Sequence, residues 1–471
     1  INKFELFLKK NFLFSLLITA FLSFLFFQFN FLNIAGTKNF FDTPSMNLEV
    51  EVTDGIINAQ ETEKFSLGRY DRSKFYDQIS PRDYKKFFAE RNQNGFFKNY
   101  NTSFGLQVKI YGFIDKFFKV NLLILNIINS LILTSLLLIF TSILKYHFSY
   151  IASFSFLISY IVSPWNISFA NEIRLIQWTW LLPIFFIFFF NIYKFKSFLI
   201  QNLLLYLSIF LSLIFKLLIS YEFFTSIVIF IFFSQLYFNI FNKISKRIFF
   251  IQIFFLIITI FLSIFFSILI HFISFSDYNL ISNFLERFSY NFSFFNQSDY
   301  RNCDNLVTNN KLNYEYISTC ISRLEVILRY FIFRNFVPFL GVFENFLNAE
   351  LKFNLVSIML NKEYFRFFNL FSKLDLYSIL SILIIICNIL AFLIFFLYAL
   401  LSLIINRYDY INIIIVGSFI ASISWFLFAK NYSYVHFHLC YVSWTFIFIP
   451  FTSMSLIEKI YLKSKKNYYF I

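Results

Sequence analysis

The sequence predicts an all-α membrane protein: a polytopic bundle of about ten transmembrane helices with two long segments outside the membrane. Of its 471 residues, 59% are hydrophobic and only 14% are charged, whereas soluble domains carry about 25% charged residues. Apolar stretches long enough to cross a bilayer of about 30 Å recur along the chain. A water-soluble fold could not bury this much apolar surface.

The apolar stretches follow one another in the order expected of a multi-pass protein. The first follows three lysines and is not followed by a small-residue cleavage site, so we expect a retained signal anchor rather than a cleaved signal peptide. All ten stretches are candidate spans, and they lie at 11–33, 120–144, 148–163, 175–193, 198–218, 223–241, 248–273, 376–405, 411–428 and 439–457.

Basic residues predict the orientation of the spans. If the N-terminus is cytoplasmic, every cytoplasmic connection is basic, as the positive-inside rule requires. The net charge of +14 is then explained by topology, and we expect no nucleic-acid partner. We therefore predict a single integral domain of the cell membrane, 1–471, with both termini cytoplasmic and with 34–119 and 274–375 as the outer segments.

The second outer segment carries two further features. Arg323–Phe343 has apolar residues interrupted by arginines at near-helical spacing, which suits a helix lying in the membrane interface. Cys303 and Cys320 lie in the same segment, and either a disulfide or two free thiols is compatible with their spacing.

Polar residues near the spans gather on the outer side. Ionisable groups are costly to bury in a membrane, so their placement is informative about function. The pattern indicates a reaction or binding site at the outer membrane face, supplied in part from the lipid phase. The residues concerned are Glu49, Glu51, Asp54, Asn171, Glu172, Arg174, Tyr221, Glu222, Lys430, His436 and His438.

Transport or lipid flipping is the alternative from another functional class. It predicts binding groups near the bilayer midplane, broken helices and often paired repeats, and the sequence gives no clear sign of these. Lys216 and His271 lie near span ends, and we expect them to be interfacial or snorkelling groups rather than members of a proton relay.

Three acidic residues in the segment 48–55, LEVEVTDG, are candidates for proton transfer. Alternation predicts an extended segment with Glu49 and Glu51 on one face and Asp54 in a turn with Gly55. A partly buried carboxylate there can accept the proton of an incoming hydroxyl, and Gly55 permits a close backbone approach. Asp54 is the preferred catalytic candidate, and a solvated acidic strand is the simpler alternative.

Arg174 begins a helix below the outer surface and could hold a lipid-linked phosphate by paired hydrogen bonds. An ion pair with Glu172 is the simpler role for this arginine. Tyr221 and Glu222 are expected in the same region, and the simpler role for Glu222 is an ion pair with Lys216 or Arg174.

The segment that follows Lys430 contains His436 and His438. On a helix these histidines would diverge by about 200°, so we expect no metal site and favour hydrogen bonding to a phosphate or sugar. Ordinary interfacial histidines are the alternative.

One N-terminal span, an acidic first outer segment and many later spans together resemble the GT-C class of integral membrane glycosyltransferases. The local motifs that carry the resemblance to multi-pass bacterial proteins of this layout are TDG at 53–55, YNTSFGLQ at 100–107, ANEIRLIQWTWLLP at 170–183, SYEFFTS at 220–226 and YSYVHFHLCYVSW at 432–444.

The resemblance implies transfer of a sugar from a polyprenyl-phosphate donor to a glycan or lipid acceptor. It implies a catalytic base in the first outer segment, at Asp54 or, as second choice, Glu51. It implies substrate-binding roles for the basic groups, which would stabilise the departing lipid phosphate. No cofactor is expected, although Asp54 lacks an adjacent acidic partner, and this leaves the need for a divalent metal open.

Overall fold

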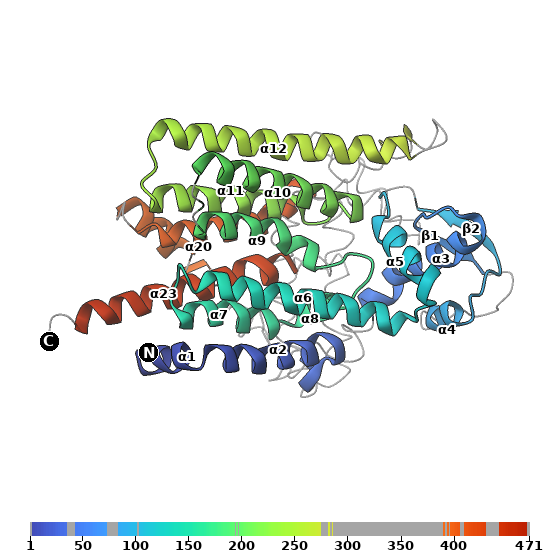
Figure 1. The fold of residues 1–471 in the computed structure, drawn as a ribbon, viewed down its shortest axis with the longest axis horizontal. Helices are drawn as coiled ribbons and strands as arrows, with labels where there is room; N and C mark the ends of the chain where they lie inside the picture. The colour runs from blue at the N-terminus through green and yellow to red at the C-terminus, as the bar shows by residue number, and fades with distance from the viewer. Residues whose placement is uncertain are drawn as a thin grey trace, which may run out of the picture.

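The computed structural model is a bundle of long apolar helices with a small cap at one end (Figure 1). It describes residues 2–34, 43–72, 83–100, 103–193, 195, 197–274, 281, 282, 285, 390, 393, 394, 396–405, 409–429 and 442–468. Most of the second outer segment lies outside this set, together with Cys303, Cys320 and Arg323–Phe343.

The all-α polytopic class is confirmed. Seven of the described helices are long and apolar enough to cross a membrane, or eight if one bent pair counts as a single span. The seven are α2 (Phe12–Phe29), α6 (Leu122–Leu144), α10 (Phe198–Ile219), α11 (Phe224–Phe241), α12 (Lys246–Ile273), α20 (Ile411–Phe428) and Trp444–Lys465, the last comprising a π-helical turn (Trp444–Phe448) and most of α23 (Ile449–Tyr468).

Two of the remaining predicted spans, 148–163 and 175–193, are broken or shorter, and most of the third, 376–405, lies outside the described residues. The predicted span 148–163 is the first half of the bent pair, α7 (Tyr150–Ile161) and α8 (Pro164–Ala170), whose axes differ by 70°. The proline explains the break, because it lacks a backbone N–H and favours the first position of a new helix. Two further apolar helices are α9 (Trp178–Ile192) and Phe396–Ile405.

The first outer segment forms the cap. Its described elements are α3 (Thr43–Thr62), β1 (Gly68–Asp71), α4 (Asp83–Ala89), β2 (Phe96–Asn99) and α5 (Leu106–Phe118), and the two strands pair antiparallel with Gly68 opposite Asn99. Both chain ends lie at the other end of the bundle, where α1 (Asn2–Lys10) and the end of α23 are found (Figure 1).

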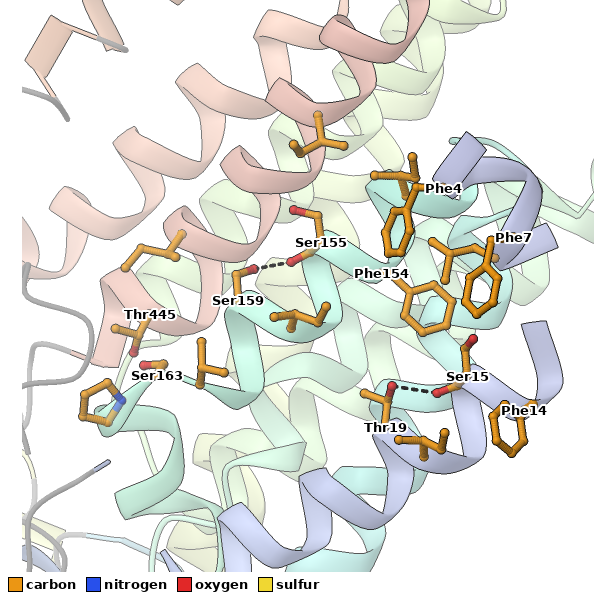
Figure 2. Close-up of a pocket in the computed structure, with 18 of the residues that line it drawn as sticks. Phe4, Phe7, Phe14, Ser15, Thr19, Phe154, Ser155, Ser159, Ser163 and Thr445 are labelled. Atoms are coloured by element: carbon orange, nitrogen blue, oxygen red, sulfur yellow. Dashed lines mark hydrogen bonds between the residues drawn. The ribbon is translucent and has the colours of Figure 1, made fainter. Parts of the chain in front are cut away.

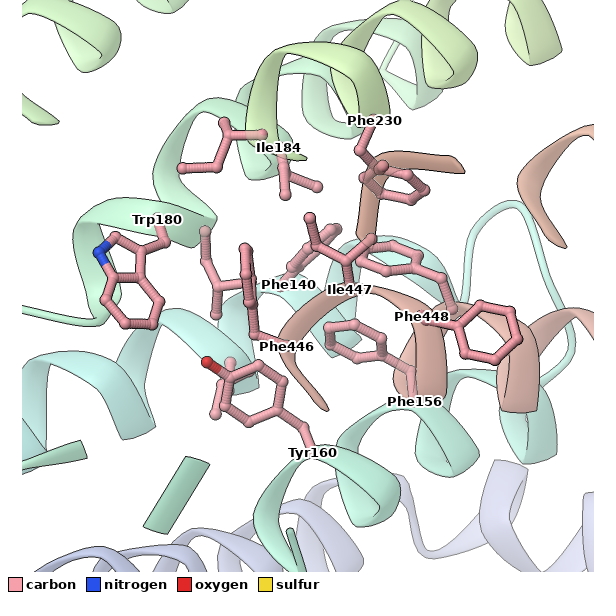
Figure 3. Packing of buried hydrophobic residues seen from close by; sticks show 14 of the residues in the cluster. Phe140, Phe156, Tyr160, Trp180, Ile184, Phe230, Phe446, Ile447 and Phe448 are labelled. Atoms are coloured by element: carbon pink, nitrogen blue, oxygen red, sulfur yellow. The ribbon is translucent and has the colours of Figure 1, made fainter. Parts of the chain in front are cut away.

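The bundle contains a large cluster of buried aromatic and aliphatic side chains. Phe451 on α23 lies at its centre, with its ring centroid 5.0 Å from that of Phe156 and 4.4 Å from that of Phe230. Figure 3 shows the surrounding side chains, which come from α6, α7, α9, α11 and the π-helical turn. Since lipid tails are as apolar as these rings, dense packing rather than a hydrophobic driving force holds such helices together.

A second apolar cluster joins the cap to the bundle. It includes Val52 and Ile56 of α3 and Val108 of α5, and it continues onto Ile173 in the connection 171–177 and Ile219 at the end of α10. The cap is therefore positioned by buried contacts with the bundle.

Asn166 ties the broken span to its neighbours. Its Nδ2 donates to the carbonyl oxygens of Tyr160 (3.0 Å) and Thr445 (2.8 Å), and its Oδ1 accepts from Thr445 Oγ1 (3.0 Å) and Gln177 Nε2 (3.1 Å). This fully buried amide connects α7, α8, the π-helical turn and the start of α9.

Replacing Asn166 with leucine should lower the free energy of unfolding in detergent micelles by about 1–3 kcal/mol, because four buried hydrogen-bonding partners lose their match. Denaturant titration would measure this loss. Asn11→Leu is the control, because this exposed amide in the turn between α1 and α2 bonds only the nearby Phe7 carbonyl among the described residues, and it should change stability by under about 0.5 kcal/mol. A loss no larger than that of the control would show that Asn166 does not hold the break.

Candidate functional site

Ionisable side chains from three segments meet where the cap faces the bundle. The segments are α3, the connection 171–177 between α8 and α9, and the end of α10 with the connection 220–223 that follows it. Among the sequence candidates, Glu49, Glu51, Asp54, Glu172, Arg174, Tyr221 and Glu222 all lie in these segments, whereas Lys430, His436 and His438 lie outside the described residues. Glu51 contacts Arg174, and Glu222 lies beside Arg174 and Lys216, whereas the contacts of Asp54 lie within the cap.

The predicted extended conformation of 48–55 is wrong. The segment lies within α3, a helix of 20 residues. On a helix, Glu49 and Glu51 point about 200° apart, so they do not share a face. The expectation about Gly55 holds, because a Cβ atom there would lie 2.3 Å from the Ser66 carbonyl oxygen. The group that approaches Gly55 closely is therefore the backbone of the cap itself, at Ser66.

Both carboxylate oxygens of Asp54 are occupied. Arg72 donates to Asp54 Oδ2 from Nη1 (2.9 Å) and to Oδ1 from Nη2 (2.8 Å), and the Tyr70 backbone N–H donates to Oδ2 (2.9 Å). The two side chains are 1% and 4% exposed. Burial raises the pKa of Asp54, and the Arg72 charge acts in the opposite direction. This geometry suits a clamp that holds the β1–β2 hairpin against α3.

The Arg72 guanidinium is enclosed on its other sides. Its carbon lies 5.1 Å from the Tyr70 ring centroid and 4.6 Å from that of Phe87, and Nη2 also donates to the Asn92 carbonyl. Arg72 thus links four parts of the cap. No local sequence pattern points to Arg72, because its partner Asp54 lies 18 residues away.

Arg174 pairs with Glu51, not with Glu172. Its Nε lies 3.1 Å from Glu51 Oε2, and the other oxygen of Glu51 binds Arg69 Nη2, also at 3.1 Å. Arg174 is 4% exposed and Arg69 is 46% exposed. Glu51 therefore joins a buried arginine to one at the surface, and it fixes the orientation of Arg174.

The terminal nitrogens of Arg174 are only partly used. Nη2 donates to Ser103 Oγ (3.3 Å), Nη1 has a long contact with the Ile219 carbonyl (3.5 Å), and the guanidinium lies 5.5 Å from the Tyr100 ring centroid. Because a guanidinium has five N–H groups, each terminal nitrogen retains one N–H without a bond to the described residues. These two donors could bind two oxygens of a phosphate.

The Glu172 carboxylate binds backbone. Its oxygens accept from the N–H groups of Arg174 (2.7 Å) and Leu175 (2.6 Å), which fixes the turn that presents the arginine. Burial raises the pKa of Glu172 to about 8, with a further contribution from the negative charge of Glu49. The carboxyl is therefore mostly protonated at neutral pH.

The raised pKa of Glu172 predicts a pH dependence of stability. The ordinary pKa of a glutamate is 4.5 and the pKa of folded Glu172 is about 8, so the folded state binds the proton more tightly than the unfolded state. The resulting stabilisation is complete below pH 4.5 and is lost as the pH rises through about 8. Thermal unfolding of the parent and of Glu172→Gln, measured from pH 4.5 to 8.5, should show a steeper decline for the parent. Parallel curves would contradict this assignment.

Lys216 and Glu222 form the second charged pair of the site. Lys216, at the end of α10, is fully buried and donates to the Ser220 carbonyl (2.7 Å) and hydroxyl (2.6 Å). The expected snorkelling role of Lys216 is therefore wrong. Glu222 precedes α11, where the helix dipole favours a negative charge. Partial burial opposes ionisation of Glu222, but the charges of Arg174 and Lys216 outweigh it and lower its pKa.

One oxygen of Glu222 stands out. The Ser220 side chain hydrogen-bonds to the carboxylate, whereas Oε2 is buried and has no hydrogen-bond partner among the described residues. Several other buried side-chain atoms among the described residues share this state, among them Gln107 Oε1 and Gln177 Oε1, but Glu222 Oε2 belongs to a carboxylate. An ionised oxygen beside two buried cations can accept a proton from a hydroxyl group of a ligand.

The backbone next to both charged residues is strained. Ile176 has φ 50° and Phe223 has φ 58°, and both side chains are buried. A left-handed conformation is rare for side chains of this kind, above all for a β-branched one, and such strain gathers at functional sites. Each strained residue is within two positions of Arg174 or Glu222.

Tyr221, next to Glu222, makes a polar contact with α12. The Tyr221 hydroxyl lies 3.3 Å from His271 Nδ1, and the His271 ring meets that of Phe104 edge-on, with centroids 6.1 Å apart. Lys109 Nζ lies 3.8 Å from the Phe104 ring centroid. His271 is buried.

Within the described residues, no group of three or more histidine, cysteine, aspartate or glutamate side chains is arranged to hold a metal ion. Scans against protein-family models, curated proteins and solved structures found no match to this chain.

Proposed function

We propose that this protein is a membrane glycosyltransferase of the GT-C type, which moves a sugar from a polyprenyl-phosphate donor to an acceptor at the extracytoplasmic face. The main support is the buried, unpartnered Glu222 Oε2 beside the cations Arg174 and Lys216. Transfer from a lipid phosphate requires a carboxylate for the acceptor hydroxyl and positive charge for the leaving phosphate, and this site contains both.

In the proposed reaction, the acceptor oxygen attacks the anomeric carbon of the sugar. The bond between that carbon and the phosphate oxygen breaks, and its electrons remain on the polyprenyl phosphate. Glu222 receives the hydroxyl proton. Arg174 and Lys216 stabilise the charge that develops on the phosphate, in an environment where burial strengthens electrostatic interactions.

The other acidic residues have positioning roles in this proposal. Glu51 orients Arg174, Glu172 shapes the turn that carries it, and Asp54 holds the cap together through Arg72. We therefore propose Glu222, just before α11, as the catalytic base in place of Asp54 or Glu51 of the first outer segment. Tyr221 borders the site through its contact with His271.

The proposal places the cap outside the cell and both termini in the cytoplasm. Tyr84 lies on α4 of the cap, so a cysteine introduced there should react with a membrane-impermeant maleimide in intact cells. A cysteine at Asn2, at the other end of the bundle, is the matched control and should react only after permeabilisation. The reverse pattern would rule out this orientation.

Binding of undecaprenyl phosphate, the donor without its sugar, tests the phosphate site. Arg174→Gln should weaken binding about 10–100-fold, because a charge-assisted pair is lost. Arg69→Gln is the matched control, since Arg69 also contacts Glu51 but is half exposed, and it should change affinity less than about fivefold. Arg174→Lys keeps the charge and should retain part of the affinity. Parent-like binding by folded Arg174→Gln would exclude this arginine from the phosphate site.

A further inference from the structure

A large apolar groove lies away from the charged site, between α1 and α2 on one side and α7 and α23 on the other (Figure 2). Its volume is about 680 Å³, within the range of ligand pockets. It follows α7 from Ile151 to Val162 and ends at Pro164 and Trp165 of α8. The helices that form its walls include α2 and α23, both long enough to span the membrane.

The walls offer little to a polar ligand. The hydroxyl groups of Thr19 and Ser159 donate to the carbonyls of Ser15 (2.7 Å) and Ser155 (2.6 Å) within their own helices, as the dashed lines in Figure 2 mark. Most other lining residues are aliphatic or aromatic, among them Phe4, Phe7 and Phe14. The groove therefore suits a hydrocarbon chain.

The α1 end of the groove is basic. The carboxylates nearby are used by the N-terminus of α7: Glu5 accepts from the N–H groups of Tyr150 (3.0 Å) and Ile151 (2.8 Å), and Glu458 accepts from that of Ser149 (2.7 Å). Exposed lysines remain on α1 and on the last turns of α23, namely Lys3, Lys9, Lys10, Lys463 and Lys465. Lysines clustered beside a membrane span attract anionic lipid headgroups.

We propose that the groove binds an acyl chain of an anionic phospholipid whose phosphate lies against the lysines of α1. Apolar walls recognise the chain, and the lysines at its open end recognise the headgroup. This lipid is separate from the sugar donor of the proposed function, because no residue of the charged site lines the groove.

Native mass spectrometry of the purified protein, titrated with phosphatidylglycerol or phosphatidylcholine, tests the proposal. We expect tighter binding of phosphatidylglycerol. Lys9→Gln/Lys10→Gln should weaken that binding about fivefold per lysine and leave phosphatidylcholine unaffected. Ser159→Phe fills the groove and should weaken binding of both lipids about tenfold, the equivalent of roughly two displaced methylene groups.

Two matched control variants test whether added side-chain bulk or lost positive charge elsewhere in the protein also changes lipid binding. Leu203→Phe enlarges an exposed side chain on α10, and Lys85→Gln/Lys86→Gln removes two charges from the cap. Neither should change lipid binding. Equal affinity for the two lipids would overturn the headgroup assignment, and parent-like binding by Ser159→Phe would overturn the groove itself. Preferential retention of undecaprenyl phosphate over phosphatidylglycerol would replace the proposed occupant with the carrier lipid.

Discussion

Replacing Asp54 with asparagine should destabilise the cap by about 3–5 kcal/mol, because it leaves the buried Arg72 charge without its carboxylate partner. The effect should appear as earlier denaturant unfolding and as faster proteolysis within 43–118. Any loss of sugar transfer should follow the loss of folded cap.

Asp71→Asn is the matched control for this experiment. Asp71 also pairs with a cation in the cap, Lys98 at 2.8 Å, but both partners are exposed, so the change should be under about 1 kcal/mol. The double variant Asp54→Leu/Arg72→Met removes both charges together and should recover much of the stability. An Asp54→Asn protein as stable as the parent and devoid of transfer would return Asp54 to the role of catalytic base.

Replacing Glu222 with glutamine should lower kcat for sugar transfer about 10²–10⁴-fold, the usual contribution of a general base. The amide has nearly the shape of the carboxylate but cannot accept the proton. KM for the donor should change little, because the phosphate contacts of Arg174 and Lys216 remain. Release of polyprenyl phosphate from synthetic short-chain polyprenyl-phosphate sugars measures the rate even when the acceptor is water.

Two further variants make this result specific. Glu222→Asp keeps the carboxylate and should retain more activity than Glu222→Gln. Glu90→Gln removes an exposed carboxylate of the cap and should leave kcat unchanged. If Glu222→Gln turned over donor at the parent rate, Glu222 would not be the base.

The sequence was informative about the bundle because membrane spans are local features. Each apolar run satisfies its own backbone hydrogen bonds as a helix, so its existence follows from composition alone. The break at Pro164 has a local signal as well, but the length of α9 does not. Whether 178–192 crosses the membrane or stops within it depends on how its neighbours pack.

The contacts between side chains of the site could not be predicted from local sequence patterns. Alternating residues in LEVEVTDG suggested a strand, yet packing of Val52 and Ile56 against the cap core selects a helix. The partners of Asp54 and Glu51 lie 18 and 123 residues away, beyond any local pattern. Lys216 seemed an interfacial lysine because Ser220, which binds it, gives no sequence signal of burial.

Some parts of the site were nevertheless accessible to sequence reasoning. The one-sided distribution of polar residues led to Arg174, Glu172, Tyr221 and Glu222, which the fold brings to one end of the bundle. Their individual roles required the geometry, since only the contacts show that Glu172 binds backbone and that Glu222 retains an unpartnered oxygen among the described residues.

The most direct test of the proposed function uses the parent protein in proteoliposomes with fluorescent short-chain polyprenyl-phosphate sugars. The account predicts cleavage of a donor, with one polyprenyl phosphate released for each sugar transferred, and loss of this release in Glu222→Gln. Movement of an intact donor from one leaflet to the other without cleavage, at equal rates in the parent and in Glu222→Gln, would contradict the account and indicate a lipid flippase.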